Sequence, residues 1–151
     1  MHEEDAFFRI NAGGLGADPY TRAKVAVAGL LALNRSETIY FTAAHDDAGN
    51  LLRTGCTYKI IGSDPPARWW SITLYAADHY LVVNPQDRYS YGGNSVARED
   101  DGSFVIVVSP HESAGNWIPT GNSQTDDTFT LTLRLYNPEA AAAHDPSGIV
   151  L

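Results

Sequence analysis

Strict alternation of apolar and polar side chains is the feature that most limits what this chain can fold into. The clearest run covers residues 128–136, where the apolar positions are Phe129, Leu131, Leu133 and Leu135. Residues 69–75 follow the same rule, with apolar positions at Trp70, Ile72 and Leu74. Because successive side chains of a strand point to opposite faces, each run has one face for a core and one face of Thr, Ser, Arg and aromatic side chains.

Turn signals separate similar runs from Glu37 onward, which indicates a β-sandwich or barrel. "DDAGN" and "EDDGS" have the Asp/Gly composition of hairpin connections. The predicted strands are Thr38 to Ala44, Cys56 to Ile61, Trp69 to Tyr75, Tyr80 to Val83, Ser103 to Ser109 and Thr128 to Tyr136, with a short one around Asn94 to Arg98.

The N-terminal part has a different character. Residues 1–18 are rich in Gly and are interpreted as a flexible lead-in or the remnant of a linker. Asp18 followed by Pro19 is a good helix start, so we predict one α-helix at about 19–33. Residues 19–151 are predicted to form a single domain, with the sandwich at about 37–138 and a C-terminal tail.

Charge narrows the classes of partner. The chain has 10 basic and 18 acidic residues, for a net charge of −8. A phosphate backbone would be repelled, so we expect no nucleic acid partner. The acidic pairs fall in predicted turns and a loop and are expected to be solvated, since the spaced ligands of a calcium loop are missing. No apolar run approaches the roughly 20 residues that cross a bilayer.

The residues that most often carry chemistry form no known pattern here. The single cysteine, Cys56, excludes an internal disulfide and is predicted to be a buried structural thiol rather than a nucleophile. The histidines considered, His45, His79, His111 and His144, show no ligand spacing. No nucleophile elbow or phosphate loop occurs. We therefore expect neither a metal nor a cofactor, and the indications for an enzyme are weak.

Aromatic side chains mixed with Arg and Asn are the most distinctive feature, and they are typical of a sugar- or polymer-binding groove. The alternative is that they belong to the core and the turns. Trp70 alternates with Ile72 and Leu74 and is predicted in the core, whereas Trp69 stays open between the two interpretations. The candidate binding residues are Trp69, Tyr75, Asn84, Arg88, Tyr89, Asn116, Trp117, Arg134 and Tyr136.

Five stretches identify a family: "WWSITLY", "NPQDRYSYGG", "DGSFVIVVSP", "GNWIPTG" and "FTLTLRLYNP". In this order and spacing they resemble the bacterial family called "domain of unknown function 1214", over about Tyr40 to Pro138. The resemblance implies a mainly β fold, a jelly-roll-like antiparallel β-sandwich, and it implies no reaction. The motif positions, candidates for a shared site or a shared framework, are Trp70, Ser71, Thr73, Tyr75, Asn84, Arg88, Tyr89, Ser90, Asn116, Trp117, Pro119, Arg134 and Tyr136.

The chain is most similar to the short stand-alone form of alphaproteobacteria, which usually begins with a membrane-anchoring segment. This implies a module of the cell envelope or periplasm, anchored to the membrane in its full-length form, or a cytoplasmic protein if no anchor exists. We expect non-enzymatic binding of a glycan, polymer or protein partner through the polar and aromatic side chains. The alternatives are an enzyme acting on a carbohydrate or envelope polymer, with Arg88 or Arg134 and a carboxylate such as Asp87, and an assembly module that forms oligomers.

Overall fold

The computed structural model describes residues 37–121, 126–139 and 149–150, and these contain strands and turns but no helix. The predicted helix at 19–33, the lead-in at 1–18 and most of the predicted tail lie outside the described residues. The strands are β1 (Thr38–Ala43), β2 (Tyr58–Gly62), β3 (Ala67–Ala76), β4 (Ser90–Gly92), β5 (Phe104–Ser109), β6 (Asn116–Pro119), β7 (Phe129–Pro138) and β8 (Ile149–Val150).

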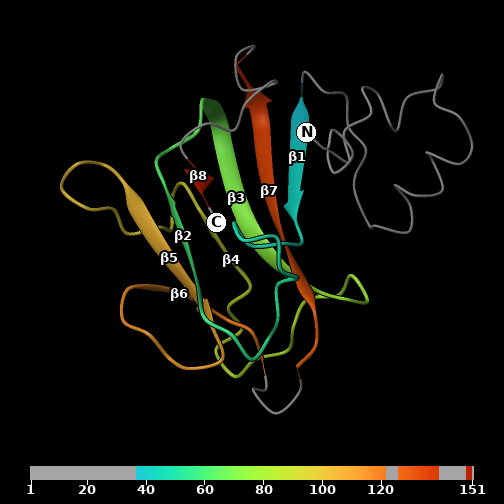
Figure 1. Ribbon diagram of the computed structural model, residues 1–151. Helices are drawn as coiled ribbons and strands as arrows, with labels where there is room; N and C mark the ends of the chain where they lie inside the picture. The colour runs from blue at the N-terminus through green and yellow to red at the C-terminus, as the bar shows by residue number, and fades with distance from the viewer. Residues whose placement is uncertain (1–36, 122–125, 140–148, 151) are drawn as a thin grey trace, which may run out of the picture.

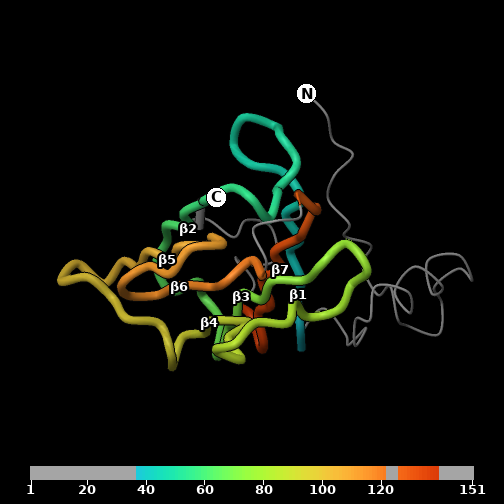
Figure 2. The backbone as a smooth tube through the Cα atoms, turned by 90° about the horizontal axis from the view of Figure 1, so that it is seen from below, coloured from blue at the N-terminus to red at the C-terminus, as the bar shows by residue number. Residues whose placement is uncertain are grey.

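The strands form two four-stranded sheets. The first sheet has the order β1-β7-β3-β4 and is antiparallel throughout, and the second has the order β6-β5-β2-β8. Figures 1 and 2 show β2, β5 and β6 on one side of the molecule and β1, β7 and β3 on the other. The two longest strands, β3 and β7, are neighbours in the first sheet and give it a long continuous surface.

One pair of strands corrects the prediction of a purely antiparallel fold. β5 and β6 run parallel, with Ile106 opposite Asn116 and Ser109 opposite Pro119. A parallel pair ordinarily needs a long crossover. Here residues 110–115 suffice, because β6 begins opposite the middle of β5 and the chain returns over only part of the strand.

Side chains from both sheets make one hydrophobic core. The predicted alternation is confirmed, because Phe129, Leu131, Leu133 and Leu135 are all buried on the core side of β7. The placement of Trp70 is also confirmed: it is 3% exposed and its ring stacks on Phe104 of the second sheet at 4.9 Å between centroids. Burial of such large aromatic rings is a major source of stability in a domain of this size.

An ion pair ties the buried Trp70 to the loop after β4. Asp64 accepts a hydrogen bond from the indole Nε1 of Trp70 at 2.9 Å and two from Arg98, at 2.7 and 3.1 Å. Arg98 also donates to the carbonyl of Gly93 at 2.6 Å. Gly92 must be a glycine for close approach, because a Cβ atom there would lie 2.7 Å from the Trp70 carbonyl oxygen.

Two predicted strands are wrong, and three strands, β4, β6 and β8, were not predicted; β8 lies in the segment predicted as a C-terminal tail. Residues 80–83 form only a single bridge between Leu81 and Tyr75. Residues 94–95 belong to a turn, and residues 96–98 have no regular secondary structure. The strand in this region is β4, slightly earlier in the sequence. β6 was not predicted, because all four of its residues are buried and it therefore shows no alternation.

The two Asp/Gly segments are tight turns, as predicted, but they are not hairpins between neighbouring strands of a sheet. In the first segment the N–H of Asp46 donates to the carbonyl of Asn50, and in the second the N–H of Glu99 donates to the carbonyl of Ser103. Each turn lies on a connection from one sheet to the other, since β1 and β2 belong to different sheets and so do β4 and β5.

The prediction of a buried Cys56 is also wrong, because this side chain is exposed. β2 begins at Tyr58, two residues later than predicted. Cys56 instead lies in the preceding turn, where its N–H donates to the carbonyl of Arg53 at 3.1 Å. Its position in the alternation would have pointed it toward the core only if the strand had extended that far.

Candidate functional site

The face of the first sheet that points away from the core is polar and aromatic. Strand register places its side chains in rows across β1, β7, β3 and β4, so that Thr38, Tyr136 and Trp69 form one row and Tyr40, Arg134 and Ser71 the next. We call this surface the polar-aromatic face. Its members are Thr38, Tyr40, Thr42, Trp69, Ser71, Thr73, Tyr75, Ser90, Thr130, Thr132, Arg134 and Tyr136.

Trp69 is the most prominent aromatic side chain on the polar-aromatic face. It is 40% exposed, in contrast to the adjacent Trp70 in the core. Its ring packs edge to face against Tyr136 with 5.2 Å between centroids. This geometry is favourable between aromatic rings, so the indole is held in place while part of its surface stays open to solvent.

Arg134 lies near the centre of the polar-aromatic face. It donates a hydrogen bond of 2.6 Å to the hydroxyl of Tyr75. Its guanidinium carbon lies 5.6 Å from the centre of the Tyr40 ring and 5.2 Å from that of Tyr75. Burial, followed by the proximity of Tyr136, raises the pKa of the Tyr40 hydroxyl, and the positive charge of Arg134 opposes that rise.

Small hydroxyl side chains lie beneath these long ones. Ser71, Thr73 and Thr132 are buried, although they point away from the core. The contact between Arg134 and Tyr75 spans the row that holds Thr73 and Thr132, which explains their burial. Thr132 also shares a hydrogen bond of 3.2 Å with Thr42. The polar-aromatic face therefore has long side chains at its surface and buried hydroxyl groups beneath them.

Four of the predicted candidates, Trp69, Tyr75, Arg134 and Tyr136, are brought together here, and the others are not. Asn84 and Arg88 belong to the β3–β4 connection, where the Asn84 amide donates to the carbonyls of Val82 and Arg88 and accepts from Arg88 N–H. Tyr89 donates to the Asp87 carboxylate at 3.0 Å, and this bond raises the pKa of Tyr89. These bonds stay within residues 82–89 and hold the connection in its turn conformation.

Asn116 and Trp117 are framework residues of the second sheet. The Asn116 amide accepts from Ala97 N–H at 2.7 Å and donates to the carbonyls of Ala97 and Val105 at 2.8 and 2.9 Å. Trp117 is 4% exposed and its indole donates to Ser109. Both side chains are therefore occupied in holding the chain together.

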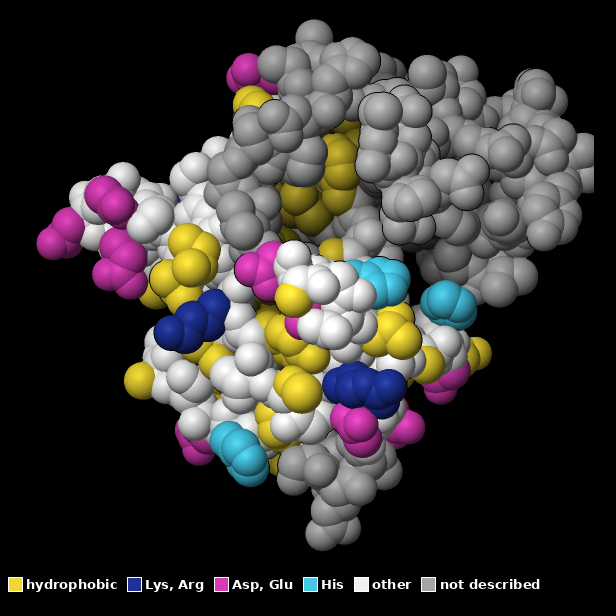
Figure 3. All heavy atoms as spheres, viewed as in Figure 1, with side chains coloured by type: hydrophobic (Ala, Val, Ile, Leu, Met, Phe, Trp, Pro, Cys, Tyr) yellow, Lys and Arg dark blue, Asp and Glu magenta, His cyan; other side chains and the backbone are white. Residues whose placement is uncertain are grey.

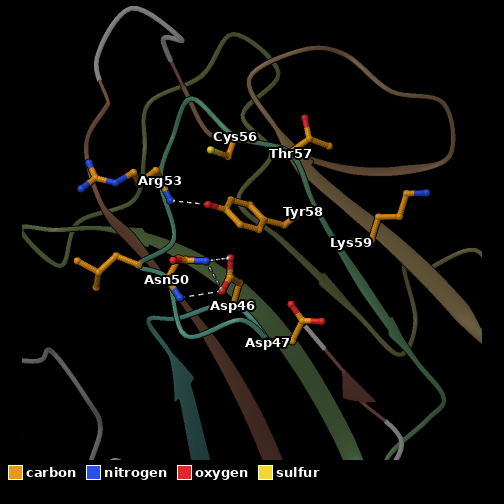
Figure 4. Close-up of a pocket in the computed structure, with 9 residues that line it drawn as sticks. Asp46, Asp47, Asn50, Arg53, Cys56, Thr57, Tyr58 and Lys59 are labelled. Carbon is orange, nitrogen blue, oxygen red and sulfur yellow. Dashed lines mark hydrogen bonds between the residues drawn. The ribbon is translucent and has the colours of Figure 1, made fainter.

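A cleft of about 750 Å³ lies elsewhere, between the turn after β1 and the start of β2 (Figure 4). None of the predicted candidates lines it. Its walls are formed by Asp46, Asp47, Asn50, Leu51, Arg53, Cys56, Thr57, Tyr58 and Lys59. Turn-forming Asp and Asn residues gave no indication of a cleft in the sequence, because it arises from the way the turn lies against β2.

Several polar groups of this cleft are already paired. Asp46 accepts hydrogen bonds from the N–H group of Asn50 and, with a smaller effect, from that of Ala48, and these bonds lower the pKa of Asp46. Arg53 forms an ion pair with Asp126 at 3.0 Å, and its N–H donates to the hydroxyl of Tyr58. Asp46 and Arg53 thus already have local partners, and the cleft offers a weaker case for ligand recognition than the polar-aromatic face.

The acidic turns are solvated, as predicted. Figure 3 shows acidic side chains gathered at the tip of the loop before β5, and Glu99, Asp100 and Asp101 are all exposed. Within the described ranges no group of three or more His, Cys, Asp or Glu residues is placed to hold a metal ion. The described residues also include no helix that is long and apolar enough to span a membrane.

Comparison with protein families matches residues 37–140 to the model described as "Protein of unknown function (DUF1214)". A crystal structure of the VPA0106 protein from Vibrio parahaemolyticus superposes with a TM-score of 0.68 at 21% identity, over 90% of this chain and 36% of that one. A putative uncharacterized protein from Burkholderia cenocepacia gives a TM-score of 0.44 at 18% identity, over 82% and 40% of the two chains. The chain thus spans less than half of either protein, and comparison with curated proteins finds no match.

Proposed function

The chain belongs to the DUF1214 family of proteins of unknown function, and from that premise we propose that it is a non-catalytic module of the cell envelope that binds a glycan through the polar-aromatic face. We also propose that the two sheets form a jelly-roll-like sandwich. The chain passes between the sheets after β1, β2, β4, β6 and β7, and the sheets share one core, which supports this architecture.

The observation that carries the proposal is the partial solvent exposure of the Trp69 side chain. An aromatic ring exposed to this degree and fixed by a neighbouring ring offers a flat apolar surface for the face of a sugar. The hydroxyl and guanidinium groups around it supply directional hydrogen bonds. A binding role requires no catalytic group, whereas the enzyme hypothesis requires several.

The enzyme hypothesis has less support. It assigns Asp87 as the partner of an arginine in a cleft, but the Asp87 carboxylate accepts the hydroxyl of Tyr89. The side-chain amides of Asn84 and Asn116 are hydrogen-bonded to backbone groups. The cleft next to β2 is lined by none of these residues. Assembly into oligomers through sheet edges stays a separate prediction, which light scattering tests.

Binding to cell-wall fractions and to a glycan array tests the proposal. Trp69→Ala is expected to lose retention on the fraction that captures the wild-type protein, because the stacking surface is removed. Tyr80→Ala is the matched control: Tyr80 is 74% exposed and lies outside the polar-aromatic face, on the β3–β4 connection. Retention of Trp69→Ala at the wild-type level, or equal losses for the two variants, would contradict the proposal.

A further inference from the structure

Arg134 differs from Arg53 and Arg98, because its partners are aromatic. Arg53 is paired with Asp126 at 3.0 Å, and Arg98 is paired with Asp64 at 2.7 Å. In the described part of the chain, Arg134 contacts the hydroxyl of Tyr75 and two tyrosine rings, and it makes no ion pair with a carboxylate. Its guanidinium has five N–H donors, so most of them are left for another acceptor.

Among the described residues, the polar-aromatic face around Arg134 carries no acidic side chain. None of the residues that make up the polar-aromatic face is an Asp or Glu. This is notable in a chain with 18 acidic residues and a net charge of −8. The polar-aromatic face therefore combines one positive charge with neutral hydroxyl groups, and it is electrostatically suited to a ligand that carries a negative charge.

The row beside that of Arg134 also holds a buried hydroxyl, that of Thr38. Its side chain is 3% exposed and its hydroxyl oxygen has no hydrogen-bond partner. A buried hydroxyl without a partner is unusual and costs stability. Register places Thr38 in the row of Tyr136 and Trp69, next to the row of Arg134. Because rows on one face are two residues apart, Trp69 and Arg134 are separated along the strands by roughly 7 Å.

We propose that the ligand of the polar-aromatic face is an acidic saccharide, whose carboxylate binds Arg134 while its sugar ring stacks on Trp69. This inference rests on the proposed function and names the class of glycan. A guanidinium matches the two oxygens of a carboxylate with two parallel hydrogen bonds. The spacing of the two residues is of the order of one saccharide unit, so one sugar engages both.

The test compares each ligand with its own uncharged form. Oligosaccharides of galacturonate, glucuronate and mannuronate are titrated into the wild-type protein by calorimetry, each beside the same oligosaccharide with its carboxylates methyl-esterified. We expect at least one acid to bind about tenfold more tightly than its ester, and this difference to shrink as salt rises from low to high concentration. The comparison uses the unmodified protein, so it does not depend on how any variant folds.

Two variants locate the effect. Arg134→Gln is expected to remove the preference for the acid over the ester, and Arg134→Lys to keep part of it, because the charge remains without the planar fork. Arg68→Gln is the matched control, since it removes one positive charge from an exposed residue of the neighbouring strand β3. It is expected to leave the preference intact, and circular dichroism verifies that each variant is folded.

The outcomes separate the two proposals. If acids and esters bind equally, or if Arg68→Gln reduces the preference as much as Arg134→Gln does, the acidic-saccharide inference is overturned while glycan binding stands. If no member of the panel binds and the glycan array is also blank, both proposals are overturned.

Discussion

Replacement of Asn116 by alanine should destabilise the protein strongly, because this amide connects three backbone groups. It accepts from Ala97 N–H at 2.7 Å and donates to the carbonyls of Ala97 and Val105 at 2.8 and 2.9 Å. The side chain is 7% exposed. At about 1 kcal/mol for each hydrogen bond, the loss is about 3 kcal/mol. Solvent can reach the backbone of the exposed Ala97 in the variant, which limits the additional penalty for unpaired groups.

Equilibrium unfolding in urea, followed by tryptophan fluorescence, measures this loss. With a slope of about 2 kcal/mol per molar urea, a loss of about 3 kcal/mol moves the midpoint by about 1.5 M. Asn94→Ala is the control, because Asn94 is an exposed asparagine in the β4–β5 loop that also contains Ala97. Its replacement should change stability by less than about 0.5 kcal/mol. If the two variants had the same midpoint, the framework role of Asn116 would be refuted. Loss of glycan binding at unchanged stability would instead make Asn116 a binding residue.

Further expectations concern a carboxylate, a thiol and two glycines. Hydrogen bonds from Arg98, with a smaller contribution from the Trp70 indole, lower the pKa of Asp64 from its ordinary value of 3.8. Asp64→Asn should therefore reduce stability at neutral pH, and its difference from wild type should vanish in acid unfolding scans as pH falls through the lowered pKa. A difference that stays constant with pH would contradict this origin. Cys56 should react completely with a thiol reagent in the native protein, and a requirement for denaturant would show that it is shielded. Gly121→Ala should lower the melting temperature more than Gly49→Ala does. Both glycines have positive φ, but only at Gly121 would a Cβ atom clash, at 2.6 Å from the Val82 side chain. Equal shifts in melting temperature would mean that backbone strain alone is the cause.

The parts of the fold that sequence predicts well are those with a strong local pattern. β3 and β7 combine long strands with strict alternation, and their core faces agree with the prediction. β6 has no such pattern because both of its faces are buried. The segment at 94–98 resembles a strand, but the Asn116 amide bonds to the backbone of Ala97 in place of a neighbouring strand. A side chain that substitutes for a strand leaves no periodic signal.

The candidate site could be predicted only in part, for a different reason. Composition identified the aromatic and polar residues, but which of them share a face depends on which strands are neighbours. Trp69 meets Tyr136, and Arg134 meets Tyr40, because β7 lies between β3 and β1. Tyr40 was not among the predicted candidates, although it points to the opposite side of β1 from Ile39 and Phe41. The local sequence gives no indication that β1 pairs with the distant β7. Strand order is a long-range property, and a single sequence does not reveal it.

The consecutive tryptophans of β3 have a consequence for how this protein can change during evolution. Trp70 stacks on Phe104 in the core, while the preceding Trp69 is open to solvent on the opposite side of the same strand. Substitutions at outward positions such as Trp69 can therefore change the chemistry of this surface with little effect on the core. An insertion or deletion within β3 would exchange the two sides at once. We expect relatives to diverge in this strand by replacement of outward residues and to keep its length unchanged.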